Sequence, residues 1–358
     1  TELLKGHYES TPDKTIVHIL HSGQPDRQVT YRELIHGSYG YTRTLEKSGI
    51  QPGEVVILIL QHGIDLLFAY YGTVLHGAIP SIMPFLTEKL SPERYRADLA
   101  ALVSVTRPTA IITYREFEPE VRAALKPGED SVRALIVSDE ADGPTAPDFA
   151  HCGGLTRKDE DIVLLQHSSG TTGLQKGVAL SHGAVHNQLV DYGQAIHINP
   201  DDVFVSWLPL YHDMGLIACF LMPILRGVPL VLLSPFDWVR APWKLMKAVS
   251  DYKGTLSWLP NFSYNFCAQK VRERDLEGID LSTWRVISNC SEPMRHESHL
   301  AFFERFKNYG LKWETLCTCY AMAENVFAVT QGGVDAPVHV DEIDREALQV
   351  QRLATPAH

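Results

Sequence analysis

The sequence predicts an α/β fold with two doubly wound, mostly parallel sheets that are flanked by helices. Apolar strands and helical segments alternate along most of the chain, which is typical of parallel sheets. The run 55–60 has no polar alternation, as expected for a strand that helices cover on both faces. A chain of 358 residues exceeds one small domain, so we expect two α/β lobes, at 1–150 and 151–358.

The first lobe is predicted to alternate between helices and strands. Thr30 and Glu33 have the spacing of a capping box, which predicts a helix that stops near Gly49. Ser91 is a good N-cap for a helix that must end before Pro108. The other expected elements are strands at 55–60, 79–83, 110–113 and 134–137, and helices at 64–76 and 118–125.

The second lobe repeats this alternation after a connector that we expect at 143–154, where glycine and proline are frequent. The stretch after Gly332 is polar and lacks a periodic pattern. Strands are predicted at 162–166, 203–206, 229–233, 254–258 and 285–289, and helices at 183–195, 214–226, 242–252, 261–272 and 295–308.

Composition excludes several classes of protein. The 32 basic and 43 acidic residues give a net charge of −11, and without a basic cluster we expect no nucleic-acid partner. The longest apolar stretch, 216–225, is shorter than the ~18–20 residues of a membrane span. No signal peptide is evident, and six irregularly spaced cysteines do not suggest a disulfide framework. We therefore expect a soluble, cytoplasmic protein.

A loop rich in hydroxyl groups and glycine follows the predicted strand at 162–166. Glycines allow backbone amides to approach an anion closely, and hydroxyls and a lysine add further donors, so the loop suits a polyphosphate. It lacks Walker A spacing and a G-x-S-x-G elbow, which disfavours a serine hydrolase. A flexible surface turn is the alternative. The expected phosphate-binding residues are Ser168, Ser169, Gly170, Thr171, Thr172, Gly173 and Lys176.

Several motifs, in order along the chain, resemble those of the adenylate-forming ligases, the superfamily of acyl-CoA synthetases, luciferases and peptide-synthetase adenylation domains. The segment 168–178 (SSGTTGLQKGV) resembles their phosphate loop. The segment 207–216 (WLPLYHDMGL) resembles the second motif of the fatty acyl-AMP ligase branch, and 320–324 (YAMAE) resembles the tyrosine-to-glutamate motif. Segments 259–262 and 291–293 fit the same branch. The resemblance implies the fold of the large N-terminal domain of such a ligase.

The resemblance also implies roles for individual residues. The loop with Lys176 would bind the β- and γ-phosphates of ATP, and His212 would stabilise charge at the α-phosphate. Glu324 would bind Mg²⁺, and Tyr320 would stack on adenine. Contacts along the adenine edge are expected from Cys290, Ser291, Glu292, Pro293, Ala321 and Met322.

Each of these residues also has a structural interpretation. His212 with Asp213 is compatible with a structural hydrogen bond, Glu324 with a helix start, and Tyr320 with the core. An acyl tunnel beside the nucleotide, or alternatively the core, would contain Trp207, Met214 and Phe262. Cys317 and Cys319 have no second cysteine pair nearby, so we expect no zinc site.

The implied function is that of an acyl-activating ligase domain. A fatty-acid-like carboxylic acid would attack MgATP, and the acyl-AMP formed would pass its acyl group to a pantetheine thiol. The thiol acceptor would be an acyl carrier protein or CoA. The alternatives are an acyl-CoA ligase and a module that binds nucleotide or acyl-adenylate without catalysis.

The sequence departs from the superfamily pattern at the predicted ATP site. Gln175 stands where proline is usual, Cys290 and Ser291 replace a smaller pair, and Ala321 replaces a glycine. These changes predict altered ATP handling, with the protein acting mainly on a preformed acyl-adenylate. Nothing after Thr330 resembles the hinge or the C-terminal lysine of the superfamily, so we expect the large N-terminal domain alone.

Overall fold

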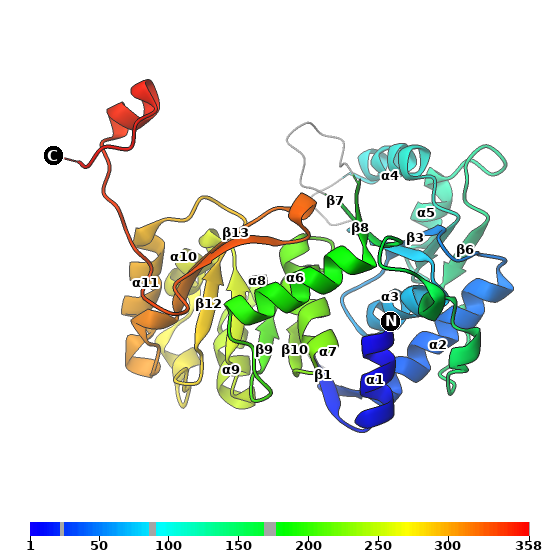
Figure 1. Cartoon of the computed structure of the whole chain (residues 1–358), viewed down its shortest axis with the longest axis horizontal. Coiled ribbons are helices and arrows are strands. Elements are labelled where there is room, and N and C mark those ends of the chain that lie inside the picture. Colours follow the sequence, from blue (N-terminus) through cyan, green and yellow to red (C-terminus); the bar gives the residue numbers. More distant parts are fainter. Residues whose placement is uncertain (22–24, 86–90, 168–176, 358) are drawn as a thin grey trace.

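The computed structural model describes residues 1–21, 25–85, 91–167 and 177–357. It confirms the α/β fold: helices surround a four-stranded sheet, an eight-stranded sheet and a two-stranded hairpin (Figure 1). Helix α1 (Glu2–Ser10), which the sequence did not predict, precedes the first strand.

The four-stranded sheet has the order β4-β3-β5-β6, and all its neighbouring strands are parallel. Its strands are buried along most of their length, as the run of apolar residues predicted. They are β3 (Val55–Ile59), β4 (Ile79–Ile82), β5 (Ala110–Thr113) and β6 (Ala134–Val137).

The helices of this part of the chain begin and end where local signals predicted. The capping box is confirmed, because the Glu33 N–H donates to Thr30 Oγ1 at 3.2 Å and the Thr30 N–H donates to the Glu33 carboxylate at 2.9 Å. Ser91 likewise caps its helix by accepting the Arg94 N–H at 3.2 Å. The helices are α2 (Tyr31–Lys47), α3 (Ile64–His76), α4 (Pro92–Thr106) and α5 (Glu118–Ala124).

The eight-stranded sheet has the order β14-β13-β12-β11-β9-β10-β1-β2. Its six inner strands are parallel, and the edge strands β14 and β2 are antiparallel to their neighbours. Two of its strands come from the first 30 residues, so the sheet joins segments of both predicted lobes, and the boundary at residue 150 stays a prediction. The strands are β1 (Thr15–Leu20), β2 (Arg27–Thr30), β9 (Phe204–Ser206), β10 (Leu230–Leu233), β11 (Leu256–Leu259), β12 (Val286–Asn289), β13 (Leu316–Ala321) and β14 (Ala328–Gly332).

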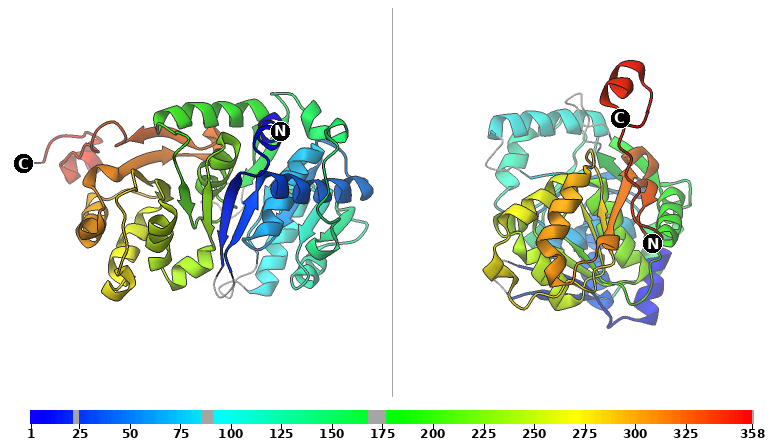
Figure 2. Two further views of the ribbon diagram at one scale, coloured as in Figure 1. Left: turned by 90° about the horizontal axis from the view of Figure 1, so that it is seen from below. Right: turned by 90° about the vertical axis from the view of Figure 1, so that its left-hand side faces the viewer.

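Helix α6 lies across one face of this sheet, and α10 and α11 cover the other face (Figures 1 and 2). The helix predicted at 214–226 has two parts, a wide π-type segment, η4 (Met214–Leu221), and α7 (Met222–Arg226). Pro223 explains the widening, because it has no N–H and would clash with the Cys219 carbonyl in a regular helix. The other helices are α6 (His182–Ala195), α8 (Pro235–Arg240), α9 (Trp243–Tyr252), α10 (Asn261–Lys270) and α11 (His296–Phe306).

The hairpin consists of β7 (Ile162–His167) and β8 (Gly177–Ser181), which pair antiparallel. Only the first of these strands was predicted. The predicted phosphate-binding residues 168–176 lie between them and are outside the described residues.

The segment from 333 to 357 extends away from the rest of the protein (Figures 1 and 2). It contains one short π-type turn, η9 (Ala347–Gln351), and an isolated bridge between Ile343 and Pro356. An ion pair of 2.5 Å between Asp335 and His197 ties its start to the end of α6. Across the described ranges, no helix combines the length and apolar character that crossing a membrane requires.

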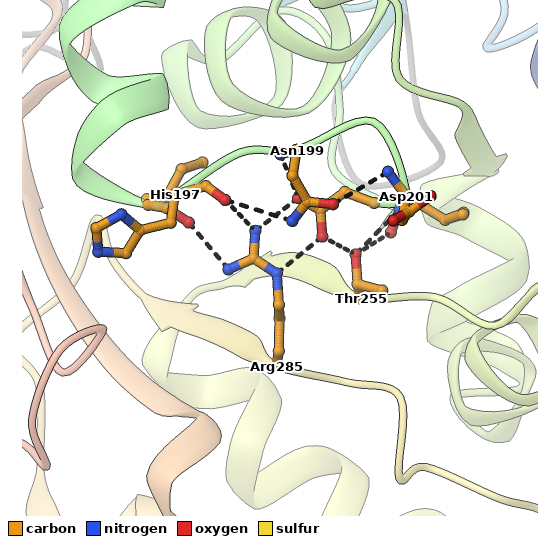
Figure 3. A network of polar contacts seen from close by, with 8 residues as sticks. His197, Asn199, Asp201, Thr255 and Arg285 are labelled. Atoms are coloured by element: carbon orange, nitrogen blue, oxygen red, sulfur yellow. Dashed lines mark hydrogen bonds and ion pairs between the residues drawn. The ribbon is translucent and has the colours of Figure 1, made fainter.

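A polar network around the buried Asp202 carboxylate holds the amino-terminal ends of three strands of the large sheet (Figure 3). Asp202, before β9, is 2% exposed and pairs with the Arg285 guanidinium, before β12, through bonds of 2.8 and 2.6 Å. Thr255, before β11, donates its hydroxyl to the same carboxylate at 2.7 Å. Arg285 also donates to the carbonyls of Ile196 and His197 at 2.9 and 3.0 Å, so it closes the end of α6.

We predict that Arg285→Ala lowers the free energy of unfolding by about 3–5 kcal/mol, because the buried Asp202 carboxylate loses its charged partner. Urea denaturation followed by circular dichroism measures this change. Arg133→Ala is the matched control, since it breaks an equally short but exposed pair with Glu54 and should cost at most about 1 kcal/mol. Equal losses in the two variants would contradict the assignment of Asp202 and Arg285 as the anchor of the sheet.

Candidate active site

The carboxyl ends of four neighbouring parallel strands, β13, β12, β11 and β9, lie at one edge of the large sheet. After β9 the chain passes to β10 on one side and then to β11 on the other side, so the strand order reverses at β9. In open α/β sheets, ligands bind outside the carboxyl ends of the strands at such a reversal. The segments that follow these four strands are those that carry the sequence motifs.

The motif after β9 turns sharply into η4. A Cβ atom on Gly215 would lie 2.2 Å from the Pro209 carbonyl oxygen, so the close approach of helix and loop requires glycine. The His212 carbonyl accepts the Leu216 N–H at 2.8 Å, and the Asp213 carboxylate accepts the Met214 N–H at 2.7 Å. His212 and Asp213 are therefore held at the start of the helix.

An electrostatic interaction connects the 207–216 motif with the 320–324 motif at the end of β13. Burial raises the pKa of Asp213, and the negative charge of Glu324 raises it further, so the two carboxyl groups interact across the edge. Desolvation lowers the pKa of His212 and the negative charge of Asp213 opposes this effect, while the residue itself is exposed at the surface. The His212 imidazole is therefore neutral at pH 7 and keeps one N–H donor.

Hydrogen bonds connect the remaining two motifs. The Ser291 hydroxyl, after β12, donates to the Met214 sulfur at 3.7 Å. The Phe262 N–H, at the start of α10, donates to the Glu292 carboxylate at 2.9 Å. Together with the interaction between the Asp213 and Glu324 carboxyl groups, these contacts bring four of the five predicted motifs to one edge, and the fifth, the phosphate loop, lies mostly outside the described residues.

The predicted adenine-binding residues are mostly open to solvent. The Tyr320 ring is 55% exposed at the end of β13, which excludes the core interpretation for this side chain. Glu324 is exposed in the short turn η8 (Ala323–Asn325). Also exposed are Ser291, Glu292, Pro293 and Met322, whereas Ala321 is half-buried and Cys290 is fully buried.

Two residues with unusual backbone angles follow β12 and β13, and neither has a sequence signal such as glycine. Ser291 has a φ of 68°. Val326 has a φ of 67° and a ψ of −55°, and the Phe327 N–H donates to the Asn325 carbonyl at 2.7 Å, which defines a γ-turn. A β-branched residue is strained in this conformation, and strain of this kind is concentrated at functional sites.

The predicted acyl-binding residues divide between core and surface. Trp207 stacks on Trp238 of α8 with ring centroids 3.6 Å apart and planes within 4°, and both indoles are buried. Phe262 packs edge-on against both and is 46% exposed. Met214 is buried beside Ser291. The aromatic cluster thus includes Trp238, which the sequence did not single out because it lies 31 positions from Trp207.

His167 ends β7 immediately before the predicted phosphate loop. Its Nε2 lies 2.7 Å from the hydroxyl of Ser81 on β4, so it ties the hairpin to the four-stranded sheet. Burial lowers the pKa of His167 to about 4. The histidine is therefore neutral at pH 7 and has a structural role at the entry to the loop.

The chain matches the AMP-binding enzyme family over residues 4–349 and belongs to that family. It is similar to the medium-chain-fatty-acid acyl-carrier-protein ligase TtuA of Teredinibacter turnerae, at 27% identity over 97% of this chain and 59% of that protein.

Solved structures agree with this family. A fatty acyl-adenylate ligase from a study of the Escherichia coli and Legionella pneumophila enzymes has a TM-score of 0.88 at 27% identity, over 99% of this chain and 64% of its own. The L. pneumophila fatty acyl-adenylate ligase in complex with acyl adenylate and pyrophosphate has a TM-score of 0.84 at 28% identity. This match covers 97% of this chain and 59% of that protein. The chain thus spans about three fifths of the length of these proteins.

We predict that the free energy of unfolding falls as the pH decreases from 6.5 to 4. Burial lowers the pKa values of His167 and of His299, which accepts the Asn289 amide, to about 4. The unfolded chain binds protons at these residues below pH 6.5 while the folded chain does not, so each contributes stability that is complete above pH 6.5 and lost toward pH 4. The loss is up to about 3 kcal/mol for each histidine.

Urea denaturation at several pH values tests this prediction. His299→Gln removes one of these proton-binding sites and should flatten the dependence of the unfolding free energy on pH by up to one proton. A wild-type protein with constant stability between pH 6.5 and 4.5 would contradict the prediction.

Proposed function

We propose that this chain is an acyl-activating ligase domain that forms or binds an acyl-adenylate from a fatty-acid-like carboxylic acid and MgATP. The observation that carries the proposal is that His212 follows β9, where the strand order reverses, while Tyr320 and Glu324 lie at the end of β13 on the same edge of the sheet, within the AMP-binding enzyme family. The complex of acyl adenylate with a similar ligase supports the same ligand class. The cytoplasmic location stays a prediction.

In the proposed reaction, a carboxylate oxygen attacks the α-phosphorus of ATP while the bond to pyrophosphate breaks. Negative charge increases on the α-phosphate oxygens, and the neutral His212 ring donates a hydrogen bond where that charge develops. Tyr320 offers an exposed ring on which adenine stacks. Positioning and electrostatic stabilisation suffice, so the reaction needs no covalent nucleophile from the protein.

The residues present are suited to a magnesium ion bound together with phosphate. Glu324 is an exposed carboxylate within electrostatic range of Asp213, and Mg²⁺ prefers a few carboxylate oxygens along with phosphate oxygens and water. In the described part of the chain no cluster of three or more His, Cys, Asp or Glu residues forms a complete metal site, which agrees with this shared mode of binding. The ion, when bound, neutralises phosphate charge.

The thiol acceptor that we favour is an acyl carrier protein, because TtuA is named as an acyl-carrier-protein ligase and the 207–216 motif resembles the fatty acyl-AMP ligase branch. CoA is the alternative. Offering both acceptors to the acyl-adenylate and measuring the thioester formed distinguishes them. Binding without turnover in the presence of both would instead support a non-catalytic module.

We predict that Tyr320→Ala weakens binding of a dodecanoyl sulfamoyl-adenosine, a stable acyl-adenylate mimic, by roughly 5- to 150-fold, because a stacked base contributes about 1–3 kcal/mol. Isothermal titration calorimetry on the folded chain measures this loss. Tyr309→Ala, at a tyrosine that pairs with Glu273 away from this edge, is the control and should bind as the wild type does. Unchanged affinity in the Tyr320 variant would remove the ring from the adenine site.

We predict that His212→Asn slows formation of acyl-AMP by about 100- to 1,000-fold, the usual cost of losing one donor to a developing oxyanion. Single-turnover assays with radiolabelled ATP and decanoic acid measure this rate, and His151→Asn is the surface control. A variant as fast as the wild type would contradict the assigned role.

An ATP–pyrophosphate exchange assay tests the separate prediction of altered ATP handling. Of the three departures, Gln175 lies outside the described residues, Ala321 avoids the positive-φ region, and the Cys290 thiol is in the core. Rapid exchange that depends on the carboxylic acid would refute the prediction, and exchange near background would support it.

A further inference from the structure

The end of the large sheet beneath the candidate adenine site contains two neighbouring thiols. In the register of β12 and β13, Asn289 pairs with Thr318, and the next step along both parallel strands places Cys290 opposite Cys319. Neighbouring strands lie about 4.8 Å apart, which is within the Cα separation of about 4.4–6.8 Å that a disulfide requires. Both side chains are buried, and because the parallel strands are in register they lie on the same face of the sheet.

The surroundings of Cys290 favour its thiolate. The neighbouring Cys319 thiol lowers the pKa of Cys290 against the opposing effect of burial, and the Ser291 hydroxyl, which lies 3.7 Å from both the Cys290 and the Met214 sulfurs, acts in the same direction. The same pairing raises the pKa of Cys319. The first proton therefore leaves Cys290, and the thiolate is the reactive form of cysteine.

We propose that Cys290 and Cys319 are a redox modification site, at which a peroxide forms a reversible disulfide that prevents acyl-adenylate binding. The formation of the disulfide rests on the strand register, which makes the two buried cysteines neighbours. Its effect on the ligand rests on the proposed function.

The reaction balances with hydrogen peroxide as the oxidant. The Cys290 thiolate attacks one peroxide oxygen, the O–O bond breaks, and a sulfenic acid and hydroxide result. The Cys319 sulfur then attacks the sulfenic sulfur, an S–S bond forms, and the displaced hydroxide combines with the Cys319 proton as water. Two thiols and one peroxide yield one disulfide and two waters.

The location of the two thiols connects oxidation to binding. Cys290 precedes Ser291, whose positive φ begins the turn at the candidate adenine edge, and Cys319 precedes Tyr320. An S–S bond of about 2.05 Å draws the two sulfurs together and so shifts both strand ends. Adjacent strands constrain the geometry of such a bond, and strained disulfides are the easily reduced, regulatory ones.

Cys317 provides a matched control on the same strand. It lies two positions before Cys319, faces the same side of the sheet and is equally buried, but its register partner is Ser288. Its thiol donates instead to the Gly333 carbonyl at 3.1 Å. If hydrogen peroxide oxidised buried thiols in general, Cys317 and Cys319 would react alike. A specific disulfide with Cys290 requires Cys319 only.

The experiment treats the folded wild type, Cys319→Ser and Cys317→Ser with hydrogen peroxide, and then with dithiothreitol. Peptide mass spectrometry maps disulfides, and calorimetry with dodecanoyl sulfamoyl-adenosine measures binding. We expect a cross-link between Cys290 and Cys319 in the wild type and in Cys317→Ser, affinity reduced by about 5- to 150-fold, and recovery after reduction. Cys319→Ser should form no such cross-link and keep its affinity.

Absence of the cross-link in the native wild type would overturn the proposal, and so would an equal loss of affinity in Cys319→Ser. A cross-link without any change in affinity would overturn its regulatory part. If the reduced wild type does not bind the mimic at all, the proposed function fails, while the mass spectrum still decides whether the disulfide forms.

Discussion

The parallel pairing of β9, β11, β12 and β13 is the constraint on which the candidate site depends. Residues between 207 and 324 become neighbours because parallel strands present all their carboxyl ends at one edge. The opposite edge is fixed by the buried pair of Asp202 and Arg285, which joins the beginnings of three of these strands to α6. A shift of one strand would therefore misplace a motif even if its own sequence were unchanged.

Much of the fold could be predicted because its signals are local. Helix α3 begins and ends at the predicted residues. The capping box of α2 could be predicted from Thr30 and Glu33 alone. The strands that escaped prediction are β1, β2, β8, β13 and β14. Several of them lie at sheet edges or pair antiparallel, where partial exposure removes the continuous apolar pattern of a covered parallel strand.

The candidate site was predictable in its parts but not in its contacts. The motifs identified His212, Tyr320 and Glu324, and the strand order places the segments that carry them at the same edge of the sheet. The stack of Trp207 on Trp238 and the thiol pair of Cys290 with Cys319 have no local signature, because each joins residues about 30 positions apart. The γ-turn at Val326 could not be predicted for a different reason, because valine rarely adopts a positive φ.

The charge of the edge restricts how a nucleotide can bind there. Asp213, Glu292 and Glu324 contribute carboxyl groups to it, and the whole chain has a net charge of −11, so an approaching triphosphate meets repulsion. The neutral His212 ring donates a hydrogen bond but supplies no positive charge. In the proposed reaction with ATP, the expected compensation is from Lys176 and from a cation that accompanies the phosphates. An acyl-adenylate, with a single phosphate, places less demand on this compensation than ATP does, which is the physical reason for expecting altered ATP handling.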